Sequence, residues 1–157
     1  MTRSSNIRSL FLSPQPSYPL AEAAELLGLT ADEVIAWIEV GELEPAGTDE
    51  GQIPWAEVVS FGMDLWSQDV VEAALGAEVA KAIPELLRLT AIEVRIPRLE
   101  VVALERVAAR DGQAVDALLA RELRDFVSTH ADWLEREIPG FAEALAWPDV
   151  DTAQLPC

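Results

Sequence analysis

A short run with alternating side chains holds the residues best suited to binding chemistry. Its apolar members are Ile92, Val94 and Ile96. Between them stand Ala91, Glu93 and Arg95. A period of two is typical of a β-strand, which turns one set of side chains to each face. On such a strand an arginine can donate two hydrogen bonds to a guanine edge, and a glutamate can accept from cytosine.

Two further arginines flank this run. Arg88 precedes it and Arg98 follows Pro97, so both could reach a phosphate backbone beside bases contacted by the strand. The other interpretation is an ordinary strand that pairs within the chain and carries solvated arginines. The spacing alone is compatible with both.

The sequence gives little support to catalysis. His130 is the only histidine and Cys157 the only cysteine, which disfavours nitrogen- and sulfur-ligated metal sites. No glycine-rich phosphate loop, nucleotide fingerprint or nucleophile elbow occurs. We therefore predict a protein that is not an enzyme, with no catalytic residue, metal or cofactor.

Charge is strongly segregated along the chain. The 157 residues include 28 acidic and 11 basic ones, for a net charge of −17. Residues 9–80 contain 14 acidic side chains and no lysine or arginine. Such a surface repels nucleic acid and anionic membranes and attracts basic proteins. With 50% hydrophobic residues, no apolar run long enough to span a bilayer and a single terminal cysteine, the composition predicts a folded cytoplasmic protein.

Breaks in the pattern divide the chain into five parts. Residues 1–17 end in a proline-rich run and predict a flexible N-terminal arm. Residues 18–67 predict helices over 20–27, 31–40 and 55–66, with a turn or small wing over 45–51. In the second of these, Thr30 and Glu33 have the spacing of a capping box. Residues 68–90 predict connecting helices, 91–130 a strand and two helices, and 131–157 a helical arm and tail.

The run over residues 18–61 resembles the excisionase-like helix-turn-helix family, which is akin to the MerR-type winged module. The match lies in YPLAEAAELLGLTADEVIAWIEVGELEP and in IPWAEVVSF after the wing. The resemblance implies a recognition helix over residues 31–40. Its outer face would offer acidic side chains where the family has arginine or polar residues, and the wing lacks the usual arginines. This departure favours protein docking over DNA contact, with Glu39 and Glu42 as candidate partner-binding residues.

Residues 91–127 resemble the ribbon-helix-helix fold of the Arc and MetJ repressors and of many antitoxins. Strand, proline, first helix, Asp-Gly turn and second helix follow one another without a gap. The resemblance implies a homodimer in which two strands pair across the dimer axis. The dimerisation residues would be Ile92, Val94, Ile96, Leu119 and Leu123.

The same resemblance implies how DNA would be bound. The paired strands would enter the major groove, so the DNA-binding candidates are Ala91, Glu93, Arg95, Arg88 and Arg98. Backbone N–H groups at the start of the second helix would hold a phosphate. Ala114 stands there in place of the usual serine or threonine cap.

Aromatic residues add a last group of candidates. Trp37, Trp55 and Trp66 have the spacing of core residues in the first domain. Trp133 and Trp147 lie in the C-terminal arm, where they would pack within the chain or dimer, or bind a partner.

Two functional interpretations follow, both for a mainly α fold with one short strand per chain. The first is a homodimeric transcriptional regulator of autorepressor or antitoxin type, which binds duplex DNA through the ribbon and a basic protein such as a toxin through acidic surfaces. The alternative is an acidic adaptor or inhibitor that reuses DNA-binding scaffolds without binding DNA. The intact ribbon favours the first, and the net charge favours the second.

Overall fold

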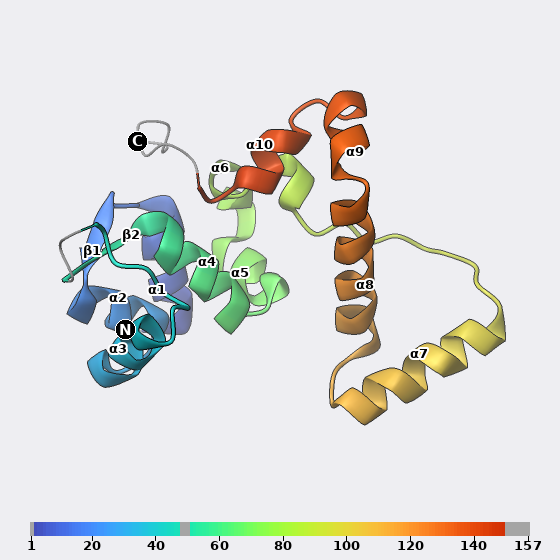
Figure 1. Ribbon diagram of the computed structural model, residues 1–157, viewed down its shortest axis with the longest axis horizontal. Coiled ribbons are helices and arrows are strands. Elements are labelled where there is room, and N and C mark those ends of the chain that lie inside the picture. The colour runs from blue at the N-terminus through green and yellow to red at the C-terminus, as the bar shows by residue number, and fades with distance from the viewer. Residues whose placement is uncertain (1, 48–50, 150–157) are drawn as a thin grey trace. The chain divides into compact units, whose positions relative to one another are not determined.

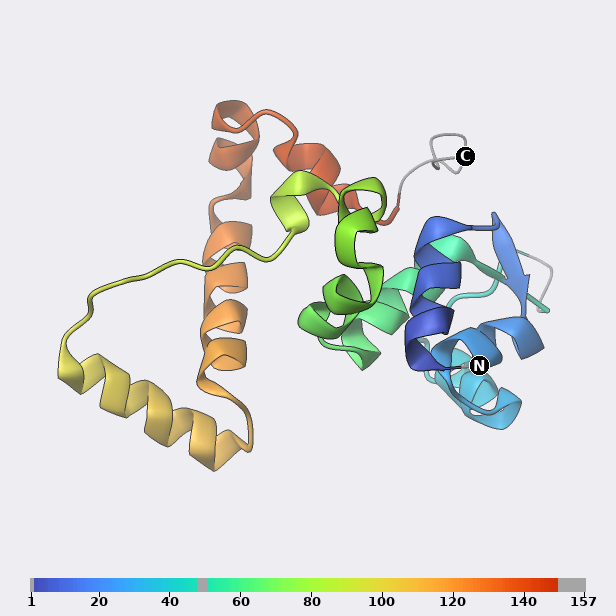
Figure 2. The same cartoon turned by 180° about the vertical axis from the view of Figure 1, so that it is seen from behind.

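The computed structural model describes residues 2–47 and 51–149. These residues are mainly helical, as the sequence predicts, and they also contain one small antiparallel sheet that the sequence analysis did not predict (Figures 1 and 2). The chain separates into two units. The first comprises Met1–Leu89 together with Glu143–Cys157, and the second comprises Thr90–Ala142.

The first unit begins with a helix where the sequence predicted a flexible arm. Helix α1 (Arg3–Leu12) starts at Thr2, whose hydroxyl accepts a hydrogen bond from the Ser5 N–H at 3.3 Å. It buries Ile7, Leu10 and Phe11 in the core, so the prediction of a flexible arm over these residues is wrong. The reason is tertiary: apolar surface on α1 is removed from water by α2 and α5.

A two-stranded sheet joins distant parts of this unit. Strand β1 (Ser17–Pro19) pairs antiparallel with β2 (Gln52–Pro54), so that Tyr18 lies opposite Ile53. Both of these side chains are buried. Each strand leads directly into a helix, α2 (Leu20–Leu27) and α4 (Trp55–Leu65) respectively. Of the predicted wing over residues 45–51, residues 48–50 lie outside the described part of the chain.

Helices α2 and α3 (Ala31–Glu39) have the predicted ends. Gly28 ends α2 in the left-handed conformation with φ 73°, which a glycine adopts without steric cost. Thr30 then caps α3: its hydroxyl accepts from the Glu33 N–H at 3.3 Å, and the Glu33 carboxylate accepts from the Thr30 N–H at 2.8 Å. The predicted capping box is therefore confirmed.

Residues 68–89 belong to the core of the first unit. They form α5 (Gln68–Leu75), η1 (Gly76–Glu78), α6 (Val79–Ala82) and η2 (Glu85–Leu87). Val71, Leu75 and Ile83 are buried with the residues of α1 and α4. The sequence predicted connecting helices here, and the helices are integral to the unit because their apolar sides are needed to close its core.

The second unit is an extended segment followed by helices. Residues 91–97 are in neither a helix nor a strand. Helices α7 (Arg98–Asp111) and α8 (Val115–Thr129) are joined by a turn at Gly112, which has φ 67°, and α9 (Ala131–Glu137) follows. The two helices α7 and α8 and the Asp-Gly turn between them agree with the sequence prediction. Helix α10 (Phe141–Ala146) spans the boundary at which the chain re-enters the first unit.

Candidate nucleic-acid and protein interfaces

The segment over residues 91–97 has no strand partner within the described part of the chain. Its predicted strand is therefore not formed, which corrects the expectation of one strand per chain in this unit. Ile92, Val94 and Ile96 are 72%, 56% and 43% exposed. A lone strand is unstable without a neighbour that accepts its backbone hydrogen bonds. The segment thus presents an open backbone edge and a row of apolar side chains to solvent.

The following helices leave a similar apolar surface uncovered. In the second unit only Ala108 and Leu118 are buried, along the described chain from Thr90 to Ala142. Both lie close to the Gly112 turn, from which α7 and α8 diverge (Figures 1 and 2). The large apolar side chains of these two helices stay exposed; they are Leu99, Val101, Val102, Val115, Leu119, Leu123 and Phe126. The expected dimerisation residues are all among the exposed ones.

The cationic candidates differ in how freely they can bind an anion. Arg95 and Arg98 are exposed, and neither forms a hydrogen bond or ion pair with another described residue. Arg88 instead lies in the first unit, where its Nε donates to the Ile83 carbonyl at 3.0 Å. The structure therefore places Ala91, Glu93, Arg95 and Arg98 in one unit and Arg88 in the other.

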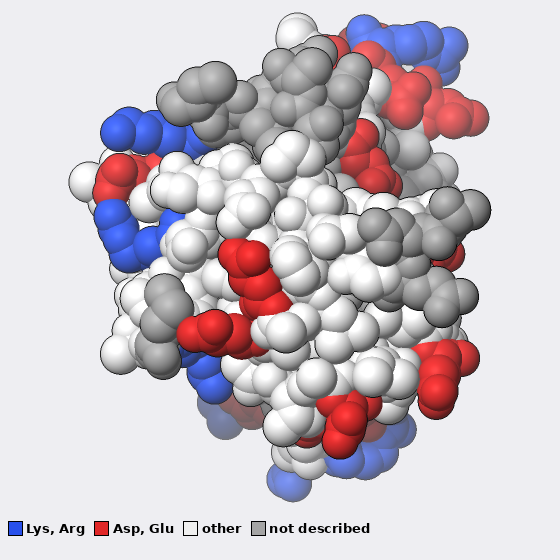
Figure 3. Space-filling view, turned by 90° about the vertical axis from the view of Figure 1, so that its left-hand side faces the viewer, with Lys and Arg blue, Asp and Glu red and all other residues white. Residues whose placement is uncertain are grey.

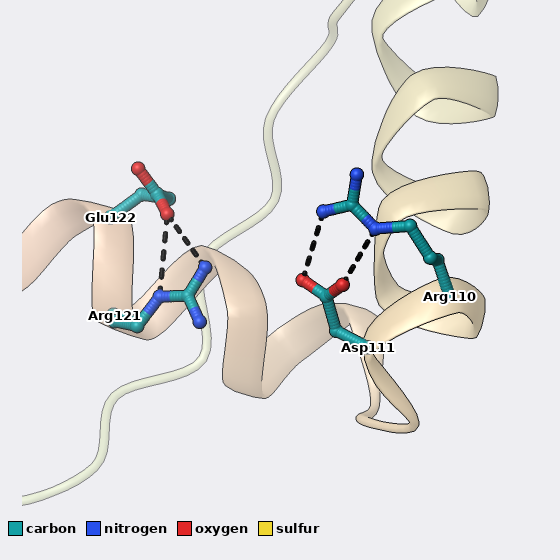
Figure 4. Close-up of polar contacts among 4 residues, drawn as sticks. All are labelled: Arg110, Asp111, Arg121 and Glu122. Atoms are coloured by element: carbon teal, nitrogen blue, oxygen red, sulfur yellow. Dashed lines mark hydrogen bonds and ion pairs between the residues drawn. The ribbon is translucent and has the colours of Figure 1, made fainter.

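Two other arginines of the second unit are occupied by their own neighbours (Figure 4). Arg110 Nε donates to Asp111 Oδ1 at 2.8 Å, and Arg121 donates to Glu122 Oε1 at 3.0 Å. The hydrogen bond from Arg110 lowers the pKa of Asp111 below its ordinary value. These exposed pairs add little stability, but each offsets a positive charge that could attract phosphate.

The start of α8 is a poorer anion site than a bare helix N-terminus. Ala114 makes no side-chain capping bond, as its replacement of serine or threonine predicts. The Asp116 carboxylate accepts from the Ala117 N–H at 2.9 Å and so occupies one of the free amides. A carboxylate here competes with phosphate for the same positive end of the helix dipole.

The acidic partner-binding candidates lie on an open surface of the first unit. Glu39 ends α3 and Glu42 follows it, and both are exposed. Trp37, predicted as core, is 41% exposed and rests on Phe61, with 5.4 Å between ring centroids. That prediction is wrong because Val34 is the one α3 residue that the described structure buries. Trp55 and Trp66 are buried as predicted.

The two tryptophans of the C-terminal arm differ in their exposure. Trp133 is 54% exposed on α9 and remains available to a partner. Trp147 packs against the first unit's core, with ring centroids 6.3 Å from Phe11 and 6.5 Å from Trp55. It therefore packs within the chain, which is the first of the two roles expected for it, while its partner-binding role stays a prediction.

Sequence reasoning missed three residues of these surfaces. Ile35 on α3 and Val40 directly after it are exposed, and the sequence analysis did not single out either one. The third is Asp116. Its place in the first turn of a predicted helix was a usable signal, because carboxylates there interact with backbone amides.

We also searched the described residues for metal sites and membrane-spanning helices. They include no group of three or more His, Cys, Asp or Glu side chains that could hold a metal ion. None of their helices combines the length and apolar character needed to cross a membrane. Comparisons with protein-family models, curated proteins and solved structures found no match to this chain.

Proposed function

We propose that this protein is a homodimeric, DNA-binding transcriptional regulator of the ribbon-helix-helix kind. Two copies would pair their residues 91–97 as an antiparallel ribbon and join α7 and α8 in one core. The acidic first unit would bind a basic protein partner, as in a regulator of antitoxin type. The ribbon would carry Arg95 on its outer face.

The observation that carries this proposal is the uncovered apolar surface of the second unit. Ile92, Val94 and Ile96 alternate with polar residues, so one register of pairing would bury all three on the same face. Leu119 and Leu123 are spaced four residues apart on α8, as expected of one helix face that packs against a partner. A second copy supplies matching surfaces for both elements under two-fold symmetry.

DNA binding is supported by the position of the free arginines. Arg95 and Arg98 have no acidic partner among the described residues, and a two-fold assembly would present each of them twice. Arginine suits this task because its planar group can hold a guanine edge or a phosphate with two hydrogen bonds. Glu93 and Asp116 oppose phosphate attraction, so we expect binding that depends on base contacts as well as on charge.

The test is fluorescence anisotropy with duplex DNA from upstream of the protein's own gene, titrated at several salt concentrations. We expect binding that weakens as salt rises. Arg95→Ala should weaken it by at least about fivefold, since a bidentate contact to a base contributes roughly 1–3 kcal/mol. Arg124→Ala removes the same charge from α8 and should leave most of the affinity. Equal losses in the two variants, or no binding at low salt, would contradict a base-reading ribbon.

One observation favours a second candidate, the acidic adaptor that does not bind DNA. Arg110 and Arg121 are offset by Asp111 and Glu122, and the net charge of the whole chain is −17. A protein that is dimeric in solution yet fails to bind the upstream DNA at any salt concentration would support this alternative.

A further inference from the structure

Helix α3 presents one outward surface that combines apolar and acidic side chains. We define this α3 face by Asp32, Ile35, Ala36, Glu39, Val40 and Glu42, all of which are exposed. The first five share one side of the helix, opposite the buried Val34, because residues three and four apart lie together. Val40 is 66% exposed at the end of the helix, where a large apolar side chain has no cover among the described residues.

Contacts with the rest of the first unit hold the α3 face in position. The Thr30–Glu33 capping box fixes its start, and Trp37 against Phe61 with the buried Val34 fixes its back. Glu33 is occupied by the cap, so it does not belong to the binding set. A preformed face loses little conformational entropy on binding, which favours its use as a docking site.

The acidic side chains of the face lack counter-ions. None of the carboxylates of Asp32, Glu39 and Glu42 forms a hydrogen bond or ion pair with another described residue. The first 80 residues contain only two arginines, and one of these, Arg8, binds the Ala74 and Leu75 carbonyls and Glu78. Figure 3 shows the side of the molecule on which α2 and α3 lie in Figure 1, with acidic side chains set among uncharged ones.

Charge and shape together determine which kind of molecule the α3 face can bind. Nucleic acid and a second α3 face would both bring negative charge against these carboxylates, and like charges across an interface oppose binding. An apolar partner would leave the carboxylates desolvated and unpaired. Asp32 and Glu39 are seven residues apart, with Ile35 and the small Ala36 between them, which matches the two-turn repeat of a second helix.

We propose that the α3 face binds a cationic amphipathic helix of a partner protein, with Lys or Arg opposite Asp32, Glu39 and Glu42 and apolar side chains on Ile35 and Val40. This assignment rests on the protein-binding half of the proposed function and is independent of DNA contact by Arg95. It specifies where the partner binds and which kinds of side chain the partner uses.

A displayed library of amphipathic helical peptides, random in charge, tests the assignment against the full-length protein. We expect the selected peptides to carry Lys or Arg about seven residues apart. Their amide chemical-shift changes should map to α3, and their affinity should fall with salt. The double variant Glu39→Lys with Glu42→Lys should weaken them by at least about tenfold. It should fold normally, because cations are favourable near a helix C-terminus.

The matched control is the double variant Glu25→Lys with Asp64→Lys, which makes the same change in charge at exposed sites on α2 and α4. It should retain most of the peptide affinity. Selection of neutral or acidic peptides, no selection at all, or an equal loss in the control would overturn the proposal. Arg95→Ala protein should bind the peptides unchanged, which separates this result from any failure of DNA binding.

Discussion

At the scale of single residues, the two units differ in how their charged groups are used. In the first unit, Arg8 and Glu33 complete helix ends: Arg8 binds carbonyls at the end of α5, and Glu33 belongs to the cap of α3. In the second unit, Arg95 and Arg98 have no partner in the described chain. Free cations in an otherwise acidic protein are the residues most able to contact an external anion.

The cap of α3 makes a prediction about pH. Hydrogen bonds from the Thr30 N–H and hydroxyl lower the pKa of Glu33. A carboxyl with a lowered folded-state pKa adds stability above its unfolded pKa and loses that contribution as pH falls through the folded value. Glu33→Gln should therefore be less stable than wild type at neutral pH, and the difference should shrink in acid. Urea unfolding of both proteins across this range measures it; a constant difference would contradict the assignment.

Residue-level signals explain why the helix ends could be predicted. Thr30, Gly28 and Gly112 start or end helices through the adjacent backbone, so the helix ends can be predicted without knowing the rest of the fold. The exposure of Trp37 could not be predicted in this way. Its apolar spacing is the same for a core and for an outward face, and only packing on Phe61 decides which one holds.

At the scale of elements, α1 is the largest departure from the sequence prediction. The polar contacts of α1 are made with distant parts of the chain. Trp55 Nε1 donates to the Leu10 carbonyl at 2.9 Å, and the Asn6 side chain donates to the Glu25 carbonyl at 2.6 Å. These contacts join residues far apart in the sequence. The serine-rich start of the chain therefore gave no periodic signal strong enough to predict them.

The role of α1 can be tested by a cavity. Leu10→Ala removes a fully buried side chain and should destabilise the protein by about 2–5 kcal/mol. Leu89→Ala removes the same atoms from an exposed site and should change stability little. Thermal unfolding of both variants gives the comparison. Equal melting temperatures would show that α1 behaves as the flexible arm that the sequence predicted.

The start of α8 supports a second element-scale prediction. Asp116→Asn keeps a hydrogen-bond acceptor for the Ala117 N–H but removes the charge that repels phosphate. If α8 contributes to DNA binding, this variant should bind upstream DNA several-fold more tightly at low salt. Asp125→Asn changes the net charge equally, farther along α8, and should have a smaller effect. Equal gains would assign the change to net charge alone.

At the scale of the whole molecule, the two units differ in how far their apolar side chains are buried. The first closes its core from segments at both ends of the chain, including α1 and Trp147. The second leaves most of its large apolar side chains exposed. The segment over residues 92–96, which the sequence predicted as a strand, is among the exposed parts of the second unit. Its alternation is visible in the sequence, but no segment of the described chain pairs with it.

We propose that the second unit forms half of a two-chain core, and the first measurement to make is sedimentation equilibrium. The chain has a mass of 17.1 kDa, so we expect twice that mass at micromolar concentration. Val94→Asp should restore the single-chain mass, since a carboxylate would be buried without a partner in the paired ribbon. Its first unit should keep the native near-ultraviolet signal of Trp55 and Trp66. A single-chain mass for the wild-type protein at all concentrations would show that the second unit does not dimerise.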